Sequence, residues 1–153
     1  MNDPVEILLV DDNPSDAELT LHVLSRHFAD RITDGIKVVH DGAEALDFIF
    51  CTGAYAGRDP HNPPKMLLLD LKLPKVDGLE VLRRAKADPR TSAIPIVVFS
   101  SSWEDRDLQQ ARELGAHSYV VKPVDFGQFV EAVRAALAIA DAIADAGANA
   151  TAP

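Results

Sequence analysis

The chain has 153 residues, a formal net charge of −9 at pH 7 and a single cysteine, Cys51. This length suits one domain with its own core, and a single cysteine excludes an internal disulfide or a multi-cysteine zinc site, so we interpret Cys51 as a small apolar side chain. The acidic charge, with no basic stripe to offset it, argues against direct binding of a nucleic acid.

Five short apolar segments follow one another along the chain, and each is typical of a β-strand. The third segment, 66–69, is an unbroken apolar run, which is typical of a strand buried on both faces in a helix-covered parallel sheet. It ends on Asp70, a residue type that is rarely buried. The predicted strands cover residues 5–10, 36–40, 66–69, 94–99 and 118–121.

Amphipathic helices are predicted after each of these strands. The first begins at Asn13-Pro14, a capping side chain followed by proline at the first helical position, and runs towards Phe28. Leu19, Val23 and Leu24 recur at helical spacing and form its expected apolar stripe. The other four helices are expected over residues 43–50, 78–88 and 103–114 and from residue 125 onwards.

Two regions depart from this alternation. Residues 52–65 contain two glycines, three prolines and the aromatic Tyr55, which predicts a long irregular connection that we interpret as a solvated surface loop. The stretch from Ala138 is rich in alanine. We therefore expect a domain over residues 1–138, followed at 139–153 by a helical extension of the last helix or a frayed tail.

Nothing in the chain predicts a membrane protein or an exported one. No stretch approaches about 18 consecutive apolar residues, and no basic lead-in precedes an apolar run at the N-terminus. We therefore expect a cytoplasmic protein.

Five strands alternating with five helices predict an α/β fold, a doubly wound parallel sheet with right-handed crossovers and helices on both faces. Parallel strands end at the same edge, and the predicted strands end in Asp11-Asp12, Asp70, Ser100 and Lys122. Ligands of open α/β sheets bind outside the carboxyl ends of the strands. We therefore expect these side chains to form one site.

The residue types at this edge suit phosphoryl transfer. Carboxylates held close together repel one another unless a cation neutralises them, and a small set of oxygen ligands suits Mg²⁺. A carboxylate can attack phosphorus to form an acyl phosphate, while a metal, an ammonium group and a hydroxyl stabilise the charge of the transferred group. Mg²⁺ at the acidic pair, together with the lysine and the serine, would supply these parts for transfer to Asp70.

The chain resembles a response-regulator receiver domain over about residues 5–138. The receiver pattern has an acidic pair after strand one, aspartate after strand three, serine or threonine after strand four and Lys-Pro after strand five. The matching residues occur in that order as Asp11-Asp12, Asp70, Ser100 and Lys122-Pro123. The resemblance implies a flavodoxin-like strand order, 2-1-3-4-5, and phosphorylation by a sensor histidine kinase.

The resemblance also implies a role for each residue around the metal. Asp70 is the expected phosphoacceptor and a metal ligand. Asp12 is expected to bind Mg²⁺ directly and Asp11 mainly through water, while the backbone carbonyl of Lys72 completes the metal shell.

On the phosphoryl side, the resemblance implies that Lys122 contacts one phosphoryl oxygen, and that Ser100 and the backbone of Ser101 contact others. Tyr119 is the aromatic residue expected to reorient as Ser100 moves, and the peptide bond before Pro123 is expected to be cis. The change would reach partners through the face made by the fourth helix, the fifth strand and the fifth helix.

With its long segment 52–65, and with no output domain expected to follow, the chain is similar to the small stand-alone regulators that serve bacterial phytochrome kinases. We accordingly expect a sensor histidine kinase, of the phytochrome type, as partner. A homodimer through the signalling face is also expected, because Ile139 and Ile143 lie one turn apart on an extended last helix.

Four alternatives remain open. The chain could pass its phosphoryl group to a histidine phosphotransfer protein as a phosphorelay intermediate, or it could be a degenerate receiver that only binds partners. An aspartate-nucleophile phosphohydrolase needs a second acid two residues after the nucleophile, where this chain has Lys72, so a turnover enzyme is not expected. A flavin carrier needs a phosphate-binding loop after the first strand, where Asp11-Asp12 would repel the phosphate.

Overall fold

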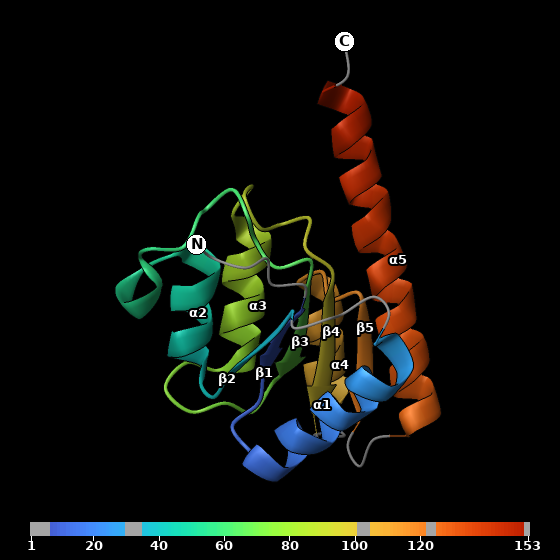
Figure 1. Ribbon diagram of the computed structural model, residues 1–153. Coiled ribbons are helices and arrows are strands. Elements are labelled where there is room, and N and C mark those ends of the chain that lie inside the picture. The colour runs from blue at the N-terminus through green and yellow to red at the C-terminus, as the bar shows by residue number, and fades with distance from the viewer. Residues whose placement is uncertain (1–6, 30–34, 101–104, 122–124, 152–153) are drawn as a thin grey trace.

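The computed structural model describes residues 7–29, 35–100, 105–121 and 125–151, and for residues 100, 105 and 143–151 it describes the backbone alone. Five parallel strands form one sheet in the order β2-β1-β3-β4-β5 (Figure 1). This order confirms the predicted flavodoxin-like fold. The strands are β1 (Ile7–Val10), β2 (Ile36–Val39), β3 (Met66–Asp70), β4 (Ile96–Ser100) and β5 (Ser118–Val121).

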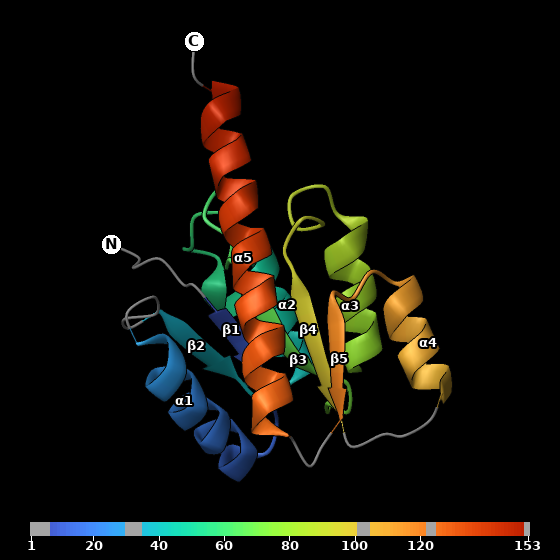
Figure 2. The ribbon, with the colours of Figure 1, turned by 90° about the vertical axis from the view of Figure 1, so that its right-hand side faces the viewer.

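Helices cover both faces of this sheet. They are α1 (Pro14–Phe28), α2 (Gly42–Phe50), α3 (Gly78–Ala87), α4 (Asp105–Glu113) and α5 (Phe126–Thr151), with a short 3-10 helix at Gly53–Tyr55. α1 and α5 pack on one face, whereas α2, α3 and α4 pack on the other (Figures 1 and 2).

The sheet separates two apolar cores because successive residues of a strand point to opposite faces. In β1, Ile7 and Leu9 face α1 and α5, whereas Leu8 and Val10 face the other layer of helices. β3 alternates in the same way, and all residues of both strands are buried. Burial on both faces explains why the central strands are unbroken apolar runs.

The predicted stripe of α1 is buried at Val23 and Leu24 but not at Leu19. Leu19 is 49% exposed, while Ala17, Leu24 and Phe28 are buried. A helix turns about 100° per residue, so the line through the buried residues leaves Leu19 on the outer side of the helix. The helix start is as predicted, since the side chain of Asn13 accepts hydrogen bonds from the first-turn amides.

β4 begins at Ile96, two residues later than predicted. Pro95 has no N–H group and can offer the sheet only its carbonyl, while the N–H of Ile94 donates to the carbonyl of Thr91. The Pro95 carbonyl takes the backbone N–H of Leu67 at 3.0 Å and so places β4 against β3.

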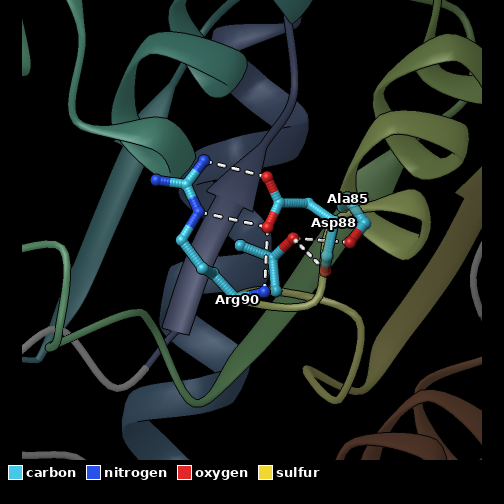
Figure 3. A network of polar contacts seen from close by, with 4 residues as sticks. Ala85, Asp88 and Arg90 are labelled. Atoms are coloured by element: carbon cyan, nitrogen blue, oxygen red, sulfur yellow. Dashed lines mark hydrogen bonds and ion pairs between the residues drawn. The ribbon is translucent and has the colours of Figure 1, made fainter.

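Three side chains hold the turn between α3 and β4. Asp88 and Arg90 of this turn, and Ala85 of α3, are labelled in Figure 3. The Asp88 carboxylate accepts from Nε of Arg90 at 3.1 Å and from its Nη2 at 2.8 Å. The buried hydroxyl of Thr91 donates to the carbonyl of Ala85 at 2.5 Å. These bonds close the end of α3 and direct the chain into β4.

The segment 52–65 is exposed over most of its length, and two of its half-buried side chains, Tyr55 and Arg58, pack against α2. Tyr55 lies edge-on to the ring of Phe48 in α2, with 5.0 Å between the ring centroids. Arg58 lies over the same ring at 3.7 Å, donates to the Phe48 carbonyl and reaches the sulfur of Cys51 at 3.6 Å. Cys51 itself ends α2 in the left-handed conformation, with φ of 57°, so it is a helix-ending residue and not a core side chain.

α5 begins at the carboxyl edge of the sheet and continues beyond the opposite edge (Figure 2). Its inner side chains are buried as predicted: Phe129, Val130, Val133 and Leu137. Within the part of the chain that the structure describes, no helix is both long enough and apolar enough to cross a bilayer.

Candidate functional site

The register of the two central strands brings Asp11 and Asp70 together. Val10 of β1 pairs with Leu69 of β3, and each aspartate is the next residue along the chain. Because β1 and β3 are parallel neighbours, both aspartates lie at the carboxyl edge of the sheet, as predicted.

Asp12 completes a cluster of three carboxylates. One oxygen each of Asp11, Asp12 and Asp70 lie within 4.8 Å of one another. Asp11 is fully buried and Asp70 is 6% exposed, whereas Asp12 faces solvent. Like charges at such distances repel, most strongly where water is excluded, so the cluster is suited to a cation.

The chain around Asp11 is fixed at several points. Its backbone N–H donates to the carbonyl of Val39 at 3.1 Å, which continues the pairing of β1 with β2. Its Oδ1 accepts the backbone N–H of Asn13 at 3.0 Å, and the ring Nδ1 of His40 lies 3.4 Å from its carbonyl oxygen. The carbonyl can only accept, so His40 is the donor in that contact.

Asp70 is held by the backbone that follows it. Its Oδ1 accepts the N–H of Lys72 at 3.0 Å, so the backbone of Lys72 turns back towards the carboxylate. The N–H of Leu71 donates to the carbonyl of Phe99 at 3.3 Å, which continues the pairing with β4. The backbone of Lys72 thus lies beside the cluster, where the receiver resemblance places a ligand, while its side chain is exposed.

Gly78 permits a close approach that sequence reasoning missed. Its N–H donates to the carbonyl of Leu71 at 2.9 Å, and a Cβ at this position would lie 2.4 Å from the carbonyl oxygen of Asp70. Any other residue would therefore push the start of α3 away from the end of β3. The only signal in the sequence is a glycine directly at a predicted helix start.

The loop after β3 is also fastened to the start of α2. A Cβ on Gly42 would lie 1.9 Å from the carbonyl oxygen of Val76, and the N–H of Gly42 donates to the carbonyl of Pro74 at 3.3 Å. Lys75 pairs with Asp41, the capping residue of α2, at 3.4 Å. The backbone N–H of Glu44 and the Lys75 ammonium hold the pKa of Asp41 below its usual value, so this carboxylate stays ionised to a lower pH.

The remaining predicted site residues are placed less completely. Ser100 is the last residue of β4 and pairs with Val121 of β5, so its backbone reaches the same edge as the carboxylates. Tyr119 is half-buried in β5 and packs against the core beneath α2, α3 and α4. Ser101, Lys122 and Pro123 lie outside the described residues.

A family model connects this arrangement to known proteins. Residues 7–134 match the model described as the response regulator receiver domain. The chain belongs to this receiver family. The five-stranded order and the acidic cluster at the carboxyl edge are therefore those of a receiver, and its relatives are mostly signalling proteins.

Two curated relatives match the receiver over most of both chains. One is described as a probable methanogenesis regulatory protein, FilR2, from Methanothrix harundinacea, with 42% identity covering 81% of this chain and 76% of that protein. The other is response regulator Rcp1 from Synechocystis, with 36% identity covering 79% of this chain and 78% of Rcp1.

Solved structures of response regulators, two of them bacteriophytochrome response regulators, are similar to this receiver. The bacteriophytochrome response regulator RtBRR has 45% identity and a TM-score of 0.74, covering 85% of this chain and 76% of that chain. The bacteriophytochrome response regulator AtBRR has 47% identity and a TM-score of 0.72, covering 87% of this chain and 92% of that chain. A Mn²⁺-bound form of Rcp1 has 32% identity and a TM-score of 0.70, covering 87% of this chain and 91% of that chain.

The donor set of this receiver fits a small divalent cation. Receiver domains generally bind Mg²⁺ at an acidic pocket, and Mg²⁺ prefers a few carboxylate oxygens with the remaining positions filled by water. Around an octahedral Mg²⁺, adjacent oxygens are about 2.9 Å apart and opposite oxygens about 4.2 Å apart. Carboxylate oxygens within 4.8 Å of one another are therefore close enough to share one ion, either directly or through its bound water.

Proposed function

We propose that this receiver accepts a phosphoryl group on Asp70 from the phosphohistidine of a sensor histidine kinase, with Mg²⁺ bound by the acidic cluster. The observation that carries the proposal is the convergence of Asp11, Asp12 and Asp70 within 4.8 Å at the carboxyl edge of the sheet. A metal-assisted phosphoryl transfer to a carboxylate needs acidic oxygens gathered in this way.

In the proposed reaction, a carboxylate oxygen of Asp70 forms a bond to phosphorus while the bond from phosphorus to the imidazole nitrogen breaks. The electron pair of the broken bond remains on the imidazole of the kinase. When bound, Mg²⁺ neutralises charge on the carboxylates and on the phosphoryl oxygens. Asp11 and Asp12 would hold the ion, Asp11 mainly through water, and the backbone carbonyl of Lys72 would add a further ligand.

The transferred group needs further contacts, which we assign by position in the receiver pattern. Ser100 and the backbone N–H of Ser101 would bind phosphoryl oxygens at the end of β4, and Lys122 would bind another after β5, aimed by a cis bond before Pro123. Tyr119 would reorient with Ser100 and carry the change to the face formed by α4, β5 and α5. A phosphoryl group that binds one arrangement better shifts the population towards it.

The direct test is labelling of Asp70→Asn. The wild-type protein incubated with acetyl phosphate and Mg²⁺ should gain the mass of one phosphoryl group, and Asp70→Asn should gain none. Asp77→Asn is the matched control, because Asp77 is an exposed acid in the same loop and makes no capping bond with its side chain. Labelling of Asp70→Asn at the wild-type level and at the same site would refute the assignment.

We propose a signalling receiver and not a turnover enzyme. A phosphohydrolase of the aspartate type needs a second acid two residues after Asp70, and Lys72 occupies that position with an exposed side chain. Steady turnover of a generic phosphate ester, lost in Asp70→Asn, would favour the hydrolase.

The proposed partner is a phytochrome-type histidine kinase. Support comes from the similarity to RtBRR and AtBRR, which share 45% and 47% identity with this chain. The test is to compare the rate of phosphotransfer to this receiver from each histidine kinase of its source. Faster transfer from a kinase without a phytochrome sensor would overturn this choice of partner.

We further propose that two copies associate through the face formed by α4, β5 and α5. α5 extends beyond the sheet, and Ile139 is a large apolar side chain that is 38% exposed on it. Ile139→Ser should shift the protein towards monomer in light scattering. Leu19→Ser is the matched control, since Leu19 is similarly exposed on α1. A phosphorylated wild-type protein that stays monomeric would exclude the dimer.

A further inference from the structure

A chain of hydrogen bonds links the segment 52–65 to the backbone of the acidic cluster. The hydroxyl of Tyr55 donates to Oε2 of Glu44 at 2.9 Å, and the other oxygen, Oε1, accepts the backbone N–H of His40 at 3.1 Å. The ring of His40 in turn lies 3.4 Å from the carbonyl oxygen of Asp11. Residues that are distant in sequence are thus joined in a line that ends at a proposed metal ligand.

Tyr55 is firmly placed at the outer end of this line. Its ring packs edge-on against Phe48, and the ammonium of Lys37 lies 5.4 Å from its centroid. Burial, together with the hydrogen bond and the negative charge of Glu44, raises the pKa of Tyr55 to about 12. The hydroxyl is therefore protonated at neutral pH and acts as a donor to Glu44.

Helix capping explains the contact of only one of the two carboxylate oxygens of Glu44. Glu44 is the third residue of α2, and its backbone N–H donates to Oδ1 of Asp41 at 2.7 Å, while its side chain reaches back to the N–H of His40. This is close to a capping box, which uses a single carboxylate oxygen. The second oxygen is bound by Tyr55, so the carboxylate is held at both ends and has little freedom to rotate.

The point that Glu44 holds is the end of β2. Val39 is the last residue of that strand, and its carbonyl accepts the N–H of Asp11 at 3.1 Å. His40 is the next residue. Its backbone N–H donates to the carboxylate of Glu44, and its ring lies beside the carbonyl of Asp11. Movement of this corner would therefore move the backbone from which the carboxylates of Asp11 and Asp12 project.

We propose that Tyr55 is a positioning residue for the metal-binding carboxylates. The bond from Tyr55 holds the carboxylate of Glu44, and Glu44 in turn holds the end of β2 at His40. His40 then keeps the backbone of Asp11 in a position from which the acidic cluster can bind Mg²⁺. The inference rests on the proposed function for its consequence, metal binding, but the positioning itself exists without metal. It gives the segment 52–65 a role in supporting the site, although it lies outside the cluster.

The test compares Tyr55→Phe with a control in the same segment. Tyr55→Phe keeps the ring against Phe48 and removes only the bond to Glu44. Thr52→Val also removes a hydrogen bond from a hydroxyl to a carboxylate, that of Thr52 to Asp47 of α2 at 2.7 Å. This bond is not part of the chain of contacts to the acidic cluster. Removing partners that orient a metal ligand costs about tenfold to a hundredfold in affinity, and for this more remote residue we expect about threefold to tenfold.

Two measurements are made on the full-length chain. Calorimetric titration with Mg²⁺ gives the dissociation constant. Amide hydrogen exchange is measured without metal. The N–H of Asn13 donates to Oδ1 of Asp11, so its exchange rate reports on how firmly Asp11 is held. The amides of β3 report on the stability of the whole sheet. In Tyr55→Phe we expect weaker Mg²⁺ binding and faster exchange at Asn13 with unchanged exchange in β3, whereas Thr52→Val should resemble the wild type.

A double-mutant cycle identifies the route. If Tyr55 acts through Glu44, Glu44→Ala alone should weaken Mg²⁺ binding as much as the double variant Tyr55→Phe/Glu44→Ala. Glu44→Gln, which can accept from His40 and donate to Tyr55, should restore binding to near the wild-type value.

Three results would overturn the proposal. These are unchanged Mg²⁺ affinity and unchanged Asn13 exchange in Tyr55→Phe, an equal loss in Thr52→Val, or additive effects in the double variant. A wild-type chain that binds no Mg²⁺ would refute the proposed metal site, and the exchange rate of Asn13 in the metal-free variants would still decide the positioning role.

Discussion

Replacing Asp12 by asparagine should stabilise the metal-free protein and remove much of its stabilisation by Mg²⁺. The substitution keeps the shape of the side chain and removes one of three charges that lie within 4.8 Å. Because Asp12 is exposed, the variant leaves no buried polar group without a partner. The two effects have opposite signs, so the order of stability should reverse as Mg²⁺ is added.

The repulsion can be calculated from Coulomb's law. At a separation of 4.8 Å, a pair of unit charges costs about 0.9 kcal/mol in water and about 3.5 kcal/mol at an effective permittivity of about 20. Asp12 faces solvent and is screened by salt, so the lower value applies to each of its two pairs, and we expect a gain of about 1–2 kcal/mol. For a domain of this size, the melting temperature should rise by about 2–8 °C.

Magnesium should reverse this order. A ligand at a hundred times its dissociation constant stabilises the native state by about 2.7 kcal/mol. The wild type should gain this stabilisation, and Asp12→Asn should gain less because one of very few protein oxygen ligands is lost. The order reverses if the dissociation constant of the variant exceeds that of the wild type by more than about 5–30-fold, the ratio that corresponds to about 1–2 kcal/mol.

The assay is thermal unfolding in a chelator and then in increasing Mg²⁺. Glu18→Gln is the matched control, because Glu18 is an exposed acid on α1 that does not belong to the cluster. It removes the same net charge at a distance from the site. A melting temperature of Asp12→Asn below the wild type in chelator, or an equal rise in Glu18→Gln, would show that repulsion within the cluster is not the cause.

Two further predictions concern the supporting structure. Gly78→Ala should destabilise the protein by about 1–3 kcal/mol in urea unfolding and should slow phosphorylation, because the added Cβ would lie 2.4 Å from a backbone oxygen. Gly57→Ala is the control and should be neutral, because nothing lies within 4 Å of its added Cβ. Equal effects of the two substitutions would refute the close-packing explanation. The pKa of Tyr55 is raised from 10.0 to about 12 in the folded state, so the unfolded chain loses the Tyr55 proton at a lower pH than the folded one does. The stabilisation of the folded state by protonated Tyr55 is therefore fully present below pH 10 and is lost as the pH rises towards 12. Tyr55→Phe should flatten the stability profile in that range, and Glu44→Gln should lower the pKa of Tyr55 measured from tyrosinate absorbance.

The layout of the sheet was predictable because it depends on signals that are local in sequence. An unbroken apolar run before Asp70 indicates a strand buried on both faces, and Asn13-Pro14 indicates a helix start. The errors have equally local causes. Leu19 lies outside the buried stripe because apolar residues alone do not fix the rotation of α1, and β4 starts late because Pro95 cannot donate a hydrogen bond.

The carboxylates of the site were predictable for the same reason, but their supports were not. Asp11 and Asp70 follow strands, and parallel strands end together. In contrast, the contact of His40 with Asp11 joins residues 29 positions apart, and that of Tyr55 with Glu44 joins residues 11 positions apart. Such pairs produce no periodicity and no motif. The composition of residues 52–65 predicts a loop, and only the packing of Tyr55 shows that the loop reaches the site.

The apolar cores also determine how the acidic cluster behaves. A slip of one residue in the pairing of β1 with β3 would turn every buried side chain of one strand to the wrong face, so two cores fix the register. With Val10 opposite Leu69, the backbones of Asp11 and Asp70 cannot separate along the strands to relieve their repulsion. The repulsion is instead opposed by apolar burial, at roughly 25 cal/mol for each Å² removed from water. A cation that enters the cluster therefore meets carboxylates already in place, and its binding releases a repulsion that the packing of the sheet has maintained.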